Sequence, residues 1–218
     1  MTTIKCLTNI KKLKLENNFI LSAFNLAFLG FFFKKKIIPN KHFIVWPDGI
    51  FAYRYGCKVK IPGRYIIENL IIDKSIKKII VLGDCSKKEI FFLKKKYKKK
   101  IFHFSLKYAP TNIIKQSIPK IEKNVIYILT LPTPKQEEIA QYISRKYSNF
   151  KVICIGGGLK MAAGLEDECP KILYKIGLEF LWRLRSDFNR RIKRLFFTLF
   201  AYILLINNKK IKLKLKHL

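Results

Sequence analysis

Short runs of apolar, mostly β-branched residues recur along the chain, and most end at a glycine, a proline or a polar turn. The clearest are residues 125–131 (VIYILTL) and 151–155 (KVICI), and residues 42–46, 78–82 and 101–106 follow the same pattern. Runs of this length and composition are typical of strands that are buried on both faces of a parallel sheet. This recurrence constrains the fold more than any other feature of the sequence.

Segments rich in helix-forming residues, 86–100 and 135–147, lie between these runs. The alternation predicts an α/β fold: a Rossmann-like, doubly wound parallel sheet with helices on both faces. Ligands of such sheets bind in the crevice at the carboxyl ends of the strands. We therefore expect the functional residues directly after the strands.

Two longer apolar stretches raise the question of a membrane. Residues 19–33 could form a signal-peptide core, but three lysines follow them instead of a small-residue cleavage site, so we interpret them as a buried helix. Residues 195–206 are too short to cross a bilayer, which requires about 20 residues. Arginines and lysines flank them on both sides, which indicates a helix lying in the membrane interface.

The chain of 218 residues carries 45 Lys and Arg against 14 Asp and Glu, a net charge of +31. Such a field attracts nucleic acid, acidic lipid headgroups or phosphorylated substrates, although a compositional drift toward Lys, Ile, Phe and Asn accounts for the excess equally well. With 50% hydrophobic residues the chain can bury a core, which excludes wholesale disorder. The pattern becomes helical and basic near residue 177, so we predict a catalytic domain at 1–176 and a basic, helical, membrane-associating appendage at 177–218.

The cysteines and histidines show no metal-binding spacing. No CxxC pair occurs and the histidines do not cluster, which indicates a reducing compartment and argues against a disulfide framework or a zinc site. We predict no metal and no other cofactor. The residues concerned are Cys6, Cys57, Cys85, Cys154, Cys169, His42, His103 and His217.

Two turns place charged side chains after apolar runs. Asp48, in the sequence WPDG, follows the strand predicted at 42–46 and could be the base that takes a proton from an attacking hydroxyl. Arg64, in the sequence IPGR, could form a fork of hydrogen bonds to a phosphate. The alternatives remain open: Pro-Asp-Gly is a common turn, and a surface arginine is usually solvated.

The sequence LPTPKQE follows the strongest predicted strand. Thr133 as N-cap, Pro134 at the first helical position and Gln136 at the third form a capping-box pattern. A helix N-terminus at the crevice attracts anions, and Lys135 adds charge for a diphosphate. Gln136 can donate to a sugar or a base if capping does not occupy it.

Two further motifs complete the set. Gly156 and Gly157, in a triple glycine after residues 151–155, allow close approach of a ligand to the backbone, although a merely flexible turn fits equally well. Near the appendage a helical pattern carries arginines that suit a diphosphate or a membrane-facing helix. The candidate residues of this second motif are Glu179, Arg183, Arg190, Lys193 and Arg194.

These motifs, in this order, resemble those of the TagA/WecG/CpsF glycosyltransferase family over roughly residues 20–195. PKQE at 134–137 and GLEFLWRL at 177–184 together are specific. The resemblance implies an inverting transfer from a UDP-sugar, often of the N-acetylmannosamine type, to an undecaprenyl-diphosphate-linked sugar in cell-surface polysaccharide synthesis. It also implies no metal requirement and a location on the inner face of the cell membrane, where the appendage meets anionic lipid.

The resemblance also implies roles for individual residues. Asp48 corresponds to the family's candidate base, and Asn25 to its early asparagine. Gln136 is the glutamine of the P-x-Q-E motif and, with Lys135, the glycine turn and nearby Arg64, would hold the donor. The appendage residues Arg183 and Arg190, with Lys193 or Arg194, would bind the acceptor diphosphate.

The sequence also departs from the family's pattern. Lys160 stands where the family often has an acidic residue, Glu168 stands where it often has an arginine, and Phe180 replaces a tryptophan. Donor identity therefore does not follow from the sequence, nor does homo-oligomerisation. Two rival functions remain: a basic nucleic-acid-binding module, although no nucleic-acid-binding motif is present and no such partner is expected, and an inactive scaffold on the membrane surface.

Overall fold

The structure is a computed structural model that describes most of the first 167 residues and the last six. No helix within the described part is long and apolar enough to cross a membrane. The described residues are 2–15, 18–34, 36–106, 109–167, 169–170, 172–173, 178, 181–182, 192, 196, 199–200, 203 and 213–218.

The described residues form one eight-stranded sheet in which every pair of neighbouring strands is parallel. Across the sheet the strands follow the order β5-β4-β6-β7-β2-β3-β1-β8. The strands are β1 (Thr2–Cys6), β2 (Phe19–Phe24), β3 (Phe43–Pro47), β4 (Lys78–Leu82), β5 (Lys100–Phe104), β6 (Val125–Leu129), β7 (Lys151–Cys154) and β8 (Leu213–His217).

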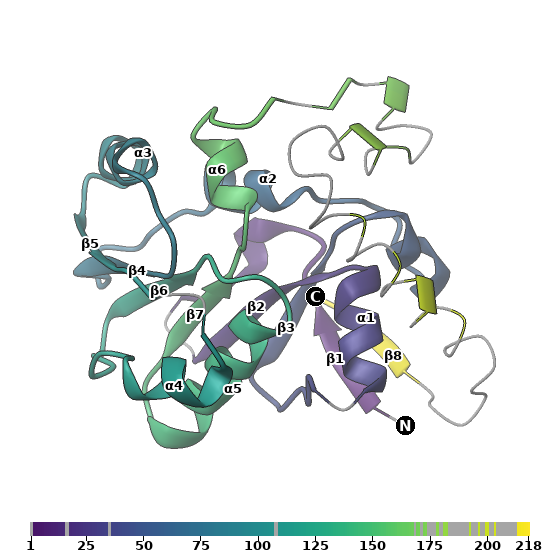
Figure 1. The fold of residues 1–218 in the computed structure, drawn as a ribbon, viewed down its shortest axis with the longest axis horizontal. Helices are drawn as coiled ribbons and strands as arrows, with labels where there is room; N and C mark the ends of the chain where they lie inside the picture. The colour runs from purple at the N-terminus through teal and green to yellow at the C-terminus, as the bar shows by residue number, and fades with distance from the viewer. Residues whose placement is uncertain are drawn as a thin grey trace.

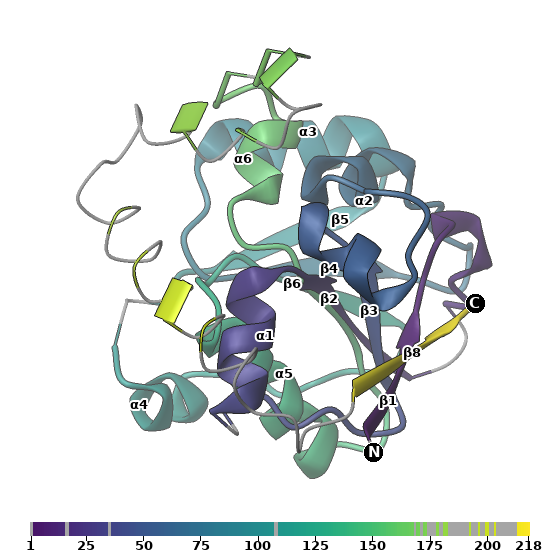
Figure 2. The same ribbon diagram turned by 90° about the vertical axis from the view of Figure 1, so that its right-hand side faces the viewer.

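Helices cover both faces of the sheet, α1, α4 and α5 on one face and α2, α3 and α6 on the other (Figures 1 and 2). The predicted fold class, a Rossmann-like parallel sheet between two helical layers, is therefore confirmed. The helices are α1 (Leu26–Phe33), α2 (Gly63–Asn69), α3 (Lys87–Tyr97), α4 (Thr111–Gln116), α5 (Lys135–Lys146) and α6 (Gly158–Ala162), with 3-10 helices η1 (Ile10–Lys12) and η2 (Ile50–Tyr55).

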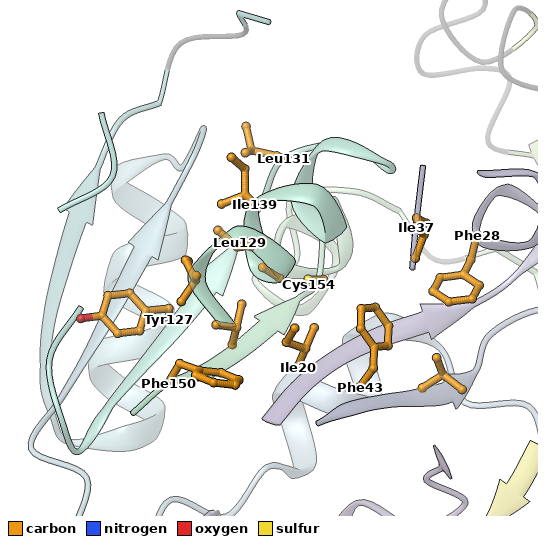
Figure 3. Packing of buried hydrophobic residues seen from close by; sticks show 14 of the residues in the cluster. Ile20, Phe28, Ile37, Phe43, Tyr127, Leu129, Leu131, Ile139, Phe150 and Cys154 are labelled. Carbon is orange, nitrogen blue, oxygen red and sulfur yellow. The ribbon is translucent and has the colours of Figure 1, made fainter. Parts of the chain in front are cut away.

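Both layers are packed because the strand residues alternate between the two faces. In β6, Tyr127 and Leu129 contribute to the core beneath α1 and α5, whereas Ile126 and Ile128 contribute to the core beneath α2 and α3. Figure 3 shows part of the first core, where Ile139 of α5 packs over β6. The continuous apolar runs in the sequence thus correspond to strands that are buried on both sides, except for residues 101–106. Their strand, β5, lies at the edge of the sheet and buries only Ile101 of its five residues. All five strands predicted from those runs are present, as β3 to β7, with ends shifted by up to two residues.

The interpretation of residues 19–33 as one buried helix was wrong. The segment is strand β2 followed by helix α1, and the two elements meet at Asn25. The Asn25 side chain accepts a hydrogen bond from the backbone N–H of Phe28 at 3.1 Å and so begins the helix. A strand buried on both faces and a buried helix have the same apolar composition, so composition alone could not separate them.

Part of the predicted appendage belongs to the sheet. Strand β8 pairs in parallel with β1 at the sheet edge, with Leu215 buried and Lys214 and Lys216 exposed on either side of it. This alternation has the period of a strand, and we had grouped both lysines with the basic rim of an interfacial helix. The division of the chain at residue 177 remains a prediction, but its second part includes this edge strand.

Candidate active site

Residues that were predicted from separate motifs follow four neighbouring strands, β6, β7, β2 and β3. Asn25 follows β2, Asp48 follows β3, Gln136 lies in the first turn of α5 after β6, and Gly156 follows β7. Because the four strands are parallel, their carboxyl ends lie at one edge of the sheet. The fold therefore brings these residues together at the carboxyl ends of the four central strands.

Asn25 and Asp48 are in direct contact. The Asn25 side-chain amide donates to a carboxylate oxygen of Asp48 at 3.1 Å, and the backbone N–H of Asp48 donates to the carbonyl of Phe24 at 3.1 Å. Gly49 follows with φ of 91°, a conformation that favours glycine. The amide fixes the orientation of the carboxylate and leaves it an acceptor, as a general base requires.

The predicted capping box at the start of α5 does not form. The N-cap is Pro134, which has no side chain able to cap, and the backbone N–H of Gln136 donates to the carbonyl of Pro132. The Gln136 amide group donates instead to the Thr133 hydroxyl at 3.2 Å and to a Glu137 carboxylate oxygen at 2.9 Å. Its side-chain oxygen is buried without a partner among the described residues. We had expected Gln136 to serve as a donor, but its free group is an acceptor.

Glu137 is the centre of a buried polar cluster that was not predicted from the sequence. The side chain is fully buried, and one carboxylate oxygen accepts from Ser22 at 2.8 Å, Thr133 at 3.3 Å and Gln136. These donors are neutral, and burial raises the pKa of the Glu137 carboxyl above its usual value. A glutamate in the first turn of a helix is usually solvated. Only the position of Glu137 in the PKQE motif could have marked it as a candidate site residue.

We expect the raised pKa of Glu137 to make the protein less stable as pH rises. Because the folded state retains the proton above the ordinary carboxyl pKa of 4.5, the free energy of unfolding falls from there up to the folded pKa. Glu137→Gln removes this titration. The free energy of unfolding of the variant should therefore fall less between pH 5 and pH 8 than that of the wild type. The difference should be about 1.4 kcal/mol for each unit by which the pKa of Glu137 is raised within that range. Urea unfolding of both proteins at each pH measures the difference. Parallel pH dependences would show that Glu137 does not titrate in this way.

Each residue of the triple glycine has a different structural role. Gly156 has φ of 52° and lies beside the Gln136 amide, where a Cβ would be 3.8 Å from the Gln136 side-chain oxygen. A Cβ on Gly157 would meet nothing within 4 Å. A Cβ on Gly158, the first residue of α6, would lie 3.2 Å from the carbonyl carbon of Gly63, the first residue of α2. Gly157 thus faces open space, whereas Gly158 allows two helices to approach closely.

The two adjacent glycines should respond differently to alanine. Gly158→Ala is expected to lower the free energy of unfolding by about 1–3 kcal/mol, because it presses on Ile155 and on the backbone at Gly63. Gly157→Ala meets open space at an ordinary φ of −71° and should leave stability unchanged within about 0.5 kcal/mol. Chemical denaturation of the two variants provides this comparison. Equal stability of both variants would contradict the close helix contact.

The predicted cations lie on elements around this edge. Lys135, in the first turn of α5, donates to the carbonyl of Ala109 in the segment after β5. Arg64 is the second residue of α2, directly after the contact between Gly63 and Gly158. The fold therefore joins the IPGR turn to the glycine turn through packing of two helices.

A further polar group lies at the carboxyl end of β4. Asp84 has a largely exposed carboxylate 3.7 Å from the ammonium of Lys160 on α6, and its carbonyl accepts from the Thr130 hydroxyl at 2.8 Å. Lys160 is one of the departures from the family pattern, and here it pairs with a carboxylate from another strand. Asp84 was missed because nothing in the sequence distinguishes it from a turn residue.

The remaining predicted site residues lie outside the part of the chain that the structure describes, and so does Glu168. They are Glu179, Arg183, Arg190, Lys193 and Arg194.

A comparison with protein families relates this arrangement to known proteins. The model of the glycosyl transferase WecG/TagA/CpsF family matches residues 87–216, which include Lys135, Gln136, the glycine turn and strand β8. No individual curated protein matches the chain.

Proposed function

Because the chain belongs to the WecG/TagA/CpsF glycosyltransferase family, we propose that it transfers a sugar from a UDP-sugar to a polyprenyl-diphosphate-linked sugar. Membership of this family indicates a glycosyltransferase of polysaccharide synthesis, and the identities of the donor and the acceptor are our proposal. We propose a donor sugar of the N-acetylmannosamine type or a related one. The observation that supports this proposal most is the contact between Asn25 and Asp48 at the edge that also carries the glycine turn.

The proposed reaction is a single displacement with inversion. Asp48 takes the proton of the acceptor hydroxyl as its oxygen attacks the anomeric carbon. The bond between that carbon and the phosphate oxygen breaks, and UDP leaves with the bonding electrons. Asn25 holds the carboxylate of Asp48 in position through the 3.1 Å hydrogen bond.

The donor would lie over the ends of β6 and β7. Gly157 leaves open space for a ligand, and Gly156 allows the tight turn beneath it. The N-terminus of α5, with Lys135, favours the negative charge of a diphosphate. Arg64 would contribute a second cation from α2, and the oxygen of Gln136 an acceptor near the turn. The appendage residues Arg183 and Arg190, with Lys193 or Arg194, would bind the acceptor diphosphate, and Glu179 would contact the substrate from the same segment.

An exposed apolar stripe supports a membrane location for this reaction. Four described helical residues, Phe196, Leu199, Phe200 and Ile203, have between 43% and 68% of their side-chain surface exposed. Helical residues that are three or four positions apart in sequence share one face. We propose that this apolar stripe enters the interface of an anionic membrane, on the cytoplasmic face, where lipid-linked acceptors would be presented.

A donor screen tests the proposed function. Radiolabelled UDP-sugars are incubated with the protein and a short-chain polyprenyl-diphosphate sugar, and transfer is followed into the lipid fraction. We expect one donor, an N-acetylmannosamine type or a relative, to be transferred. If no donor is turned over while the protein still binds anionic liposomes, the chain is an inactive membrane scaffold and the proposal is wrong.

A further inference from the structure

Three metal-binding side chains meet at the end of the sheet edge formed by β1 and β8. Strands β1 and β8 lie side by side (Figure 2). Cys6 is the last residue of β1, and its register partner in β8 is His217. Cys57 comes from the segment after η2, where its backbone N–H donates to the carbonyl of Ala52 at 3.2 Å. The ligating atoms of these three residues all lie within 4.8 Å of one another.

The distance between the two sulfur atoms is informative. The sulfur atoms of Cys6 and Cys57 are 3.7 Å apart. Two thiolates bound to one zinc ion at about 2.3 Å in tetrahedral geometry are separated by about 3.8 Å. A disulfide would require about 2.05 Å, so one or both side chains would have to move toward the other. The two sulfur atoms are therefore already at the separation of zinc-bound thiolates, a separation that a hydrogen bond between two thiols also has.

The ligand set and its surroundings also fit zinc. A site with two sulfur ligands and an imidazole binds zinc in preference to hard cations such as magnesium. Both cysteines are buried, whereas His217 is exposed, so the ion would face solvent on the histidine side. We propose that Cys6, Cys57 and His217 bind one zinc ion, with a solvent molecule as the fourth ligand.

This ion would have a structural role. It would connect β1, β8 and the segment that follows Asp48 and Gly49, and so hold the edge strand and the end of η2 together. Because the three ligands come together only in the folded chain, binding stabilises the folded state. The expectation of no zinc site rested on local spacing, whereas Cys6 and Cys57 are 51 residues apart and His217 lies at the far end of the chain.

Metal titration of the whole chain tests the proposal. The protein is purified with a non-thiol reductant, stripped with a chelator, and titrated with Co²⁺ as a spectroscopic probe and then with Zn²⁺. We expect one equivalent of Co²⁺ per chain, with thiolate-to-cobalt charge-transfer absorption that Zn²⁺ abolishes. Cys57→Ser should lose this absorption. Changing a residue that only supports a metal ligand weakens metal affinity by about 10-fold or more. His217 is proposed as a direct ligand, so His217→Ala should weaken Zn²⁺ binding at least as much.

Matched controls separate this site from the other thiols and imidazoles. Cys169→Ser and His42→Ala change residues outside the cluster and should bind Co²⁺ as the wild type does. His217 is exposed, so its variant should remain folded and report on the ligand alone. Absence of the charge-transfer band in the wild type, or its persistence in Cys57→Ser, would overturn the proposal. So would a Cys6–Cys57 disulfide, detected by mass spectrometry, that reforms in preference to metal binding. None of these readouts depends on sugar transfer.

Discussion

Asp48→Asn is expected to lower kcat by at least about 10²-fold, the low end of the contribution of a general base. The asparagine oxygen can still accept the hydrogen bond that Asn25 donates at 3.1 Å, so the turn should keep its geometry. What the variant loses is the ability to take a proton from the acceptor hydroxyl. Donor binding should change little, because the donor is proposed to lie over β6 and β7 rather than over β3. Steady-state transfer kinetics with the donor found in the screen measure both effects.

Asp73→Asn provides the matched control. Asp73 is an exposed aspartate whose side chain accepts from the backbone N–H of Ser75 at 2.7 Å, a bond that asparagine can also accept. This variant should retain wild-type kcat. If Asp48→Asn also turns over at the wild-type rate while remaining folded, Asp48 has no part in the chemistry.

Replacing the apolar stripe of Phe196, Leu199, Phe200 and Ile203 by glutamine is expected to weaken binding to anionic liposomes by about 10²-fold or more. Burying a large apolar side chain contributes about 1.5–3 kcal/mol, and four partly inserted side chains add up to at least the 2.7 kcal/mol that this factor requires. Sedimentation with liposomes that contain anionic lipid measures the effect. Substitution is preferable to truncation, because removing residues 195–218 would also remove β8 from the sheet.

The control for the stripe uses exposed apolar residues elsewhere. Ile71 and Phe91 are 69% and 68% exposed, as accessible as any residue of the stripe, but lie outside it. Changing both to glutamine should leave liposome binding intact. If the stripe variant still sediments with the liposomes at physiological salt, the lysines and arginines alone account for membrane binding, and the proposed role of the stripe is wrong.

The fold could be predicted from the sequence for strands that are buried on both faces. Runs such as residues 125–129 are apolar on both faces, and this pattern is seldom found outside the centre of a parallel sheet. The same property misled us at residues 19–33, where the strand and the helix are both apolar apart from Ser22, and only the capping side chain of Asn25 marks the boundary between them. Strand β8 was missed because its lysines resembled the preceding basic tail.

The site could be predicted only in part. Asp48 and Gln136 were found because each follows a strand, but the contact between Asn25 and Asp48 depends on β2 and β3 being neighbours in the sheet. Contacts of this kind join residues that are far apart in the chain. The hydrogen bond from Ser22 to Glu137, which are 115 residues apart, and the proximity of Cys6 to His217 are further examples. No local pattern in the sequence encodes them.

We propose that two parts of the site act separately: the ends of β6 and β7 hold the donor, and Asp48 after β3 performs proton transfer. Calorimetric titration of UDP and the UDP-sugar into the wild type, Asp48→Asn and Gly157→Ala tests this division without turnover. We expect Asp48→Asn to bind both ligands with an unchanged Kd. Gly157→Ala, whose methyl group enters open space without disturbing the fold, should bind at least about 10-fold more weakly, because a ligand atom would have to give way. Equal Kd values for all three proteins, or no binding of UDP to the wild type, would contradict it.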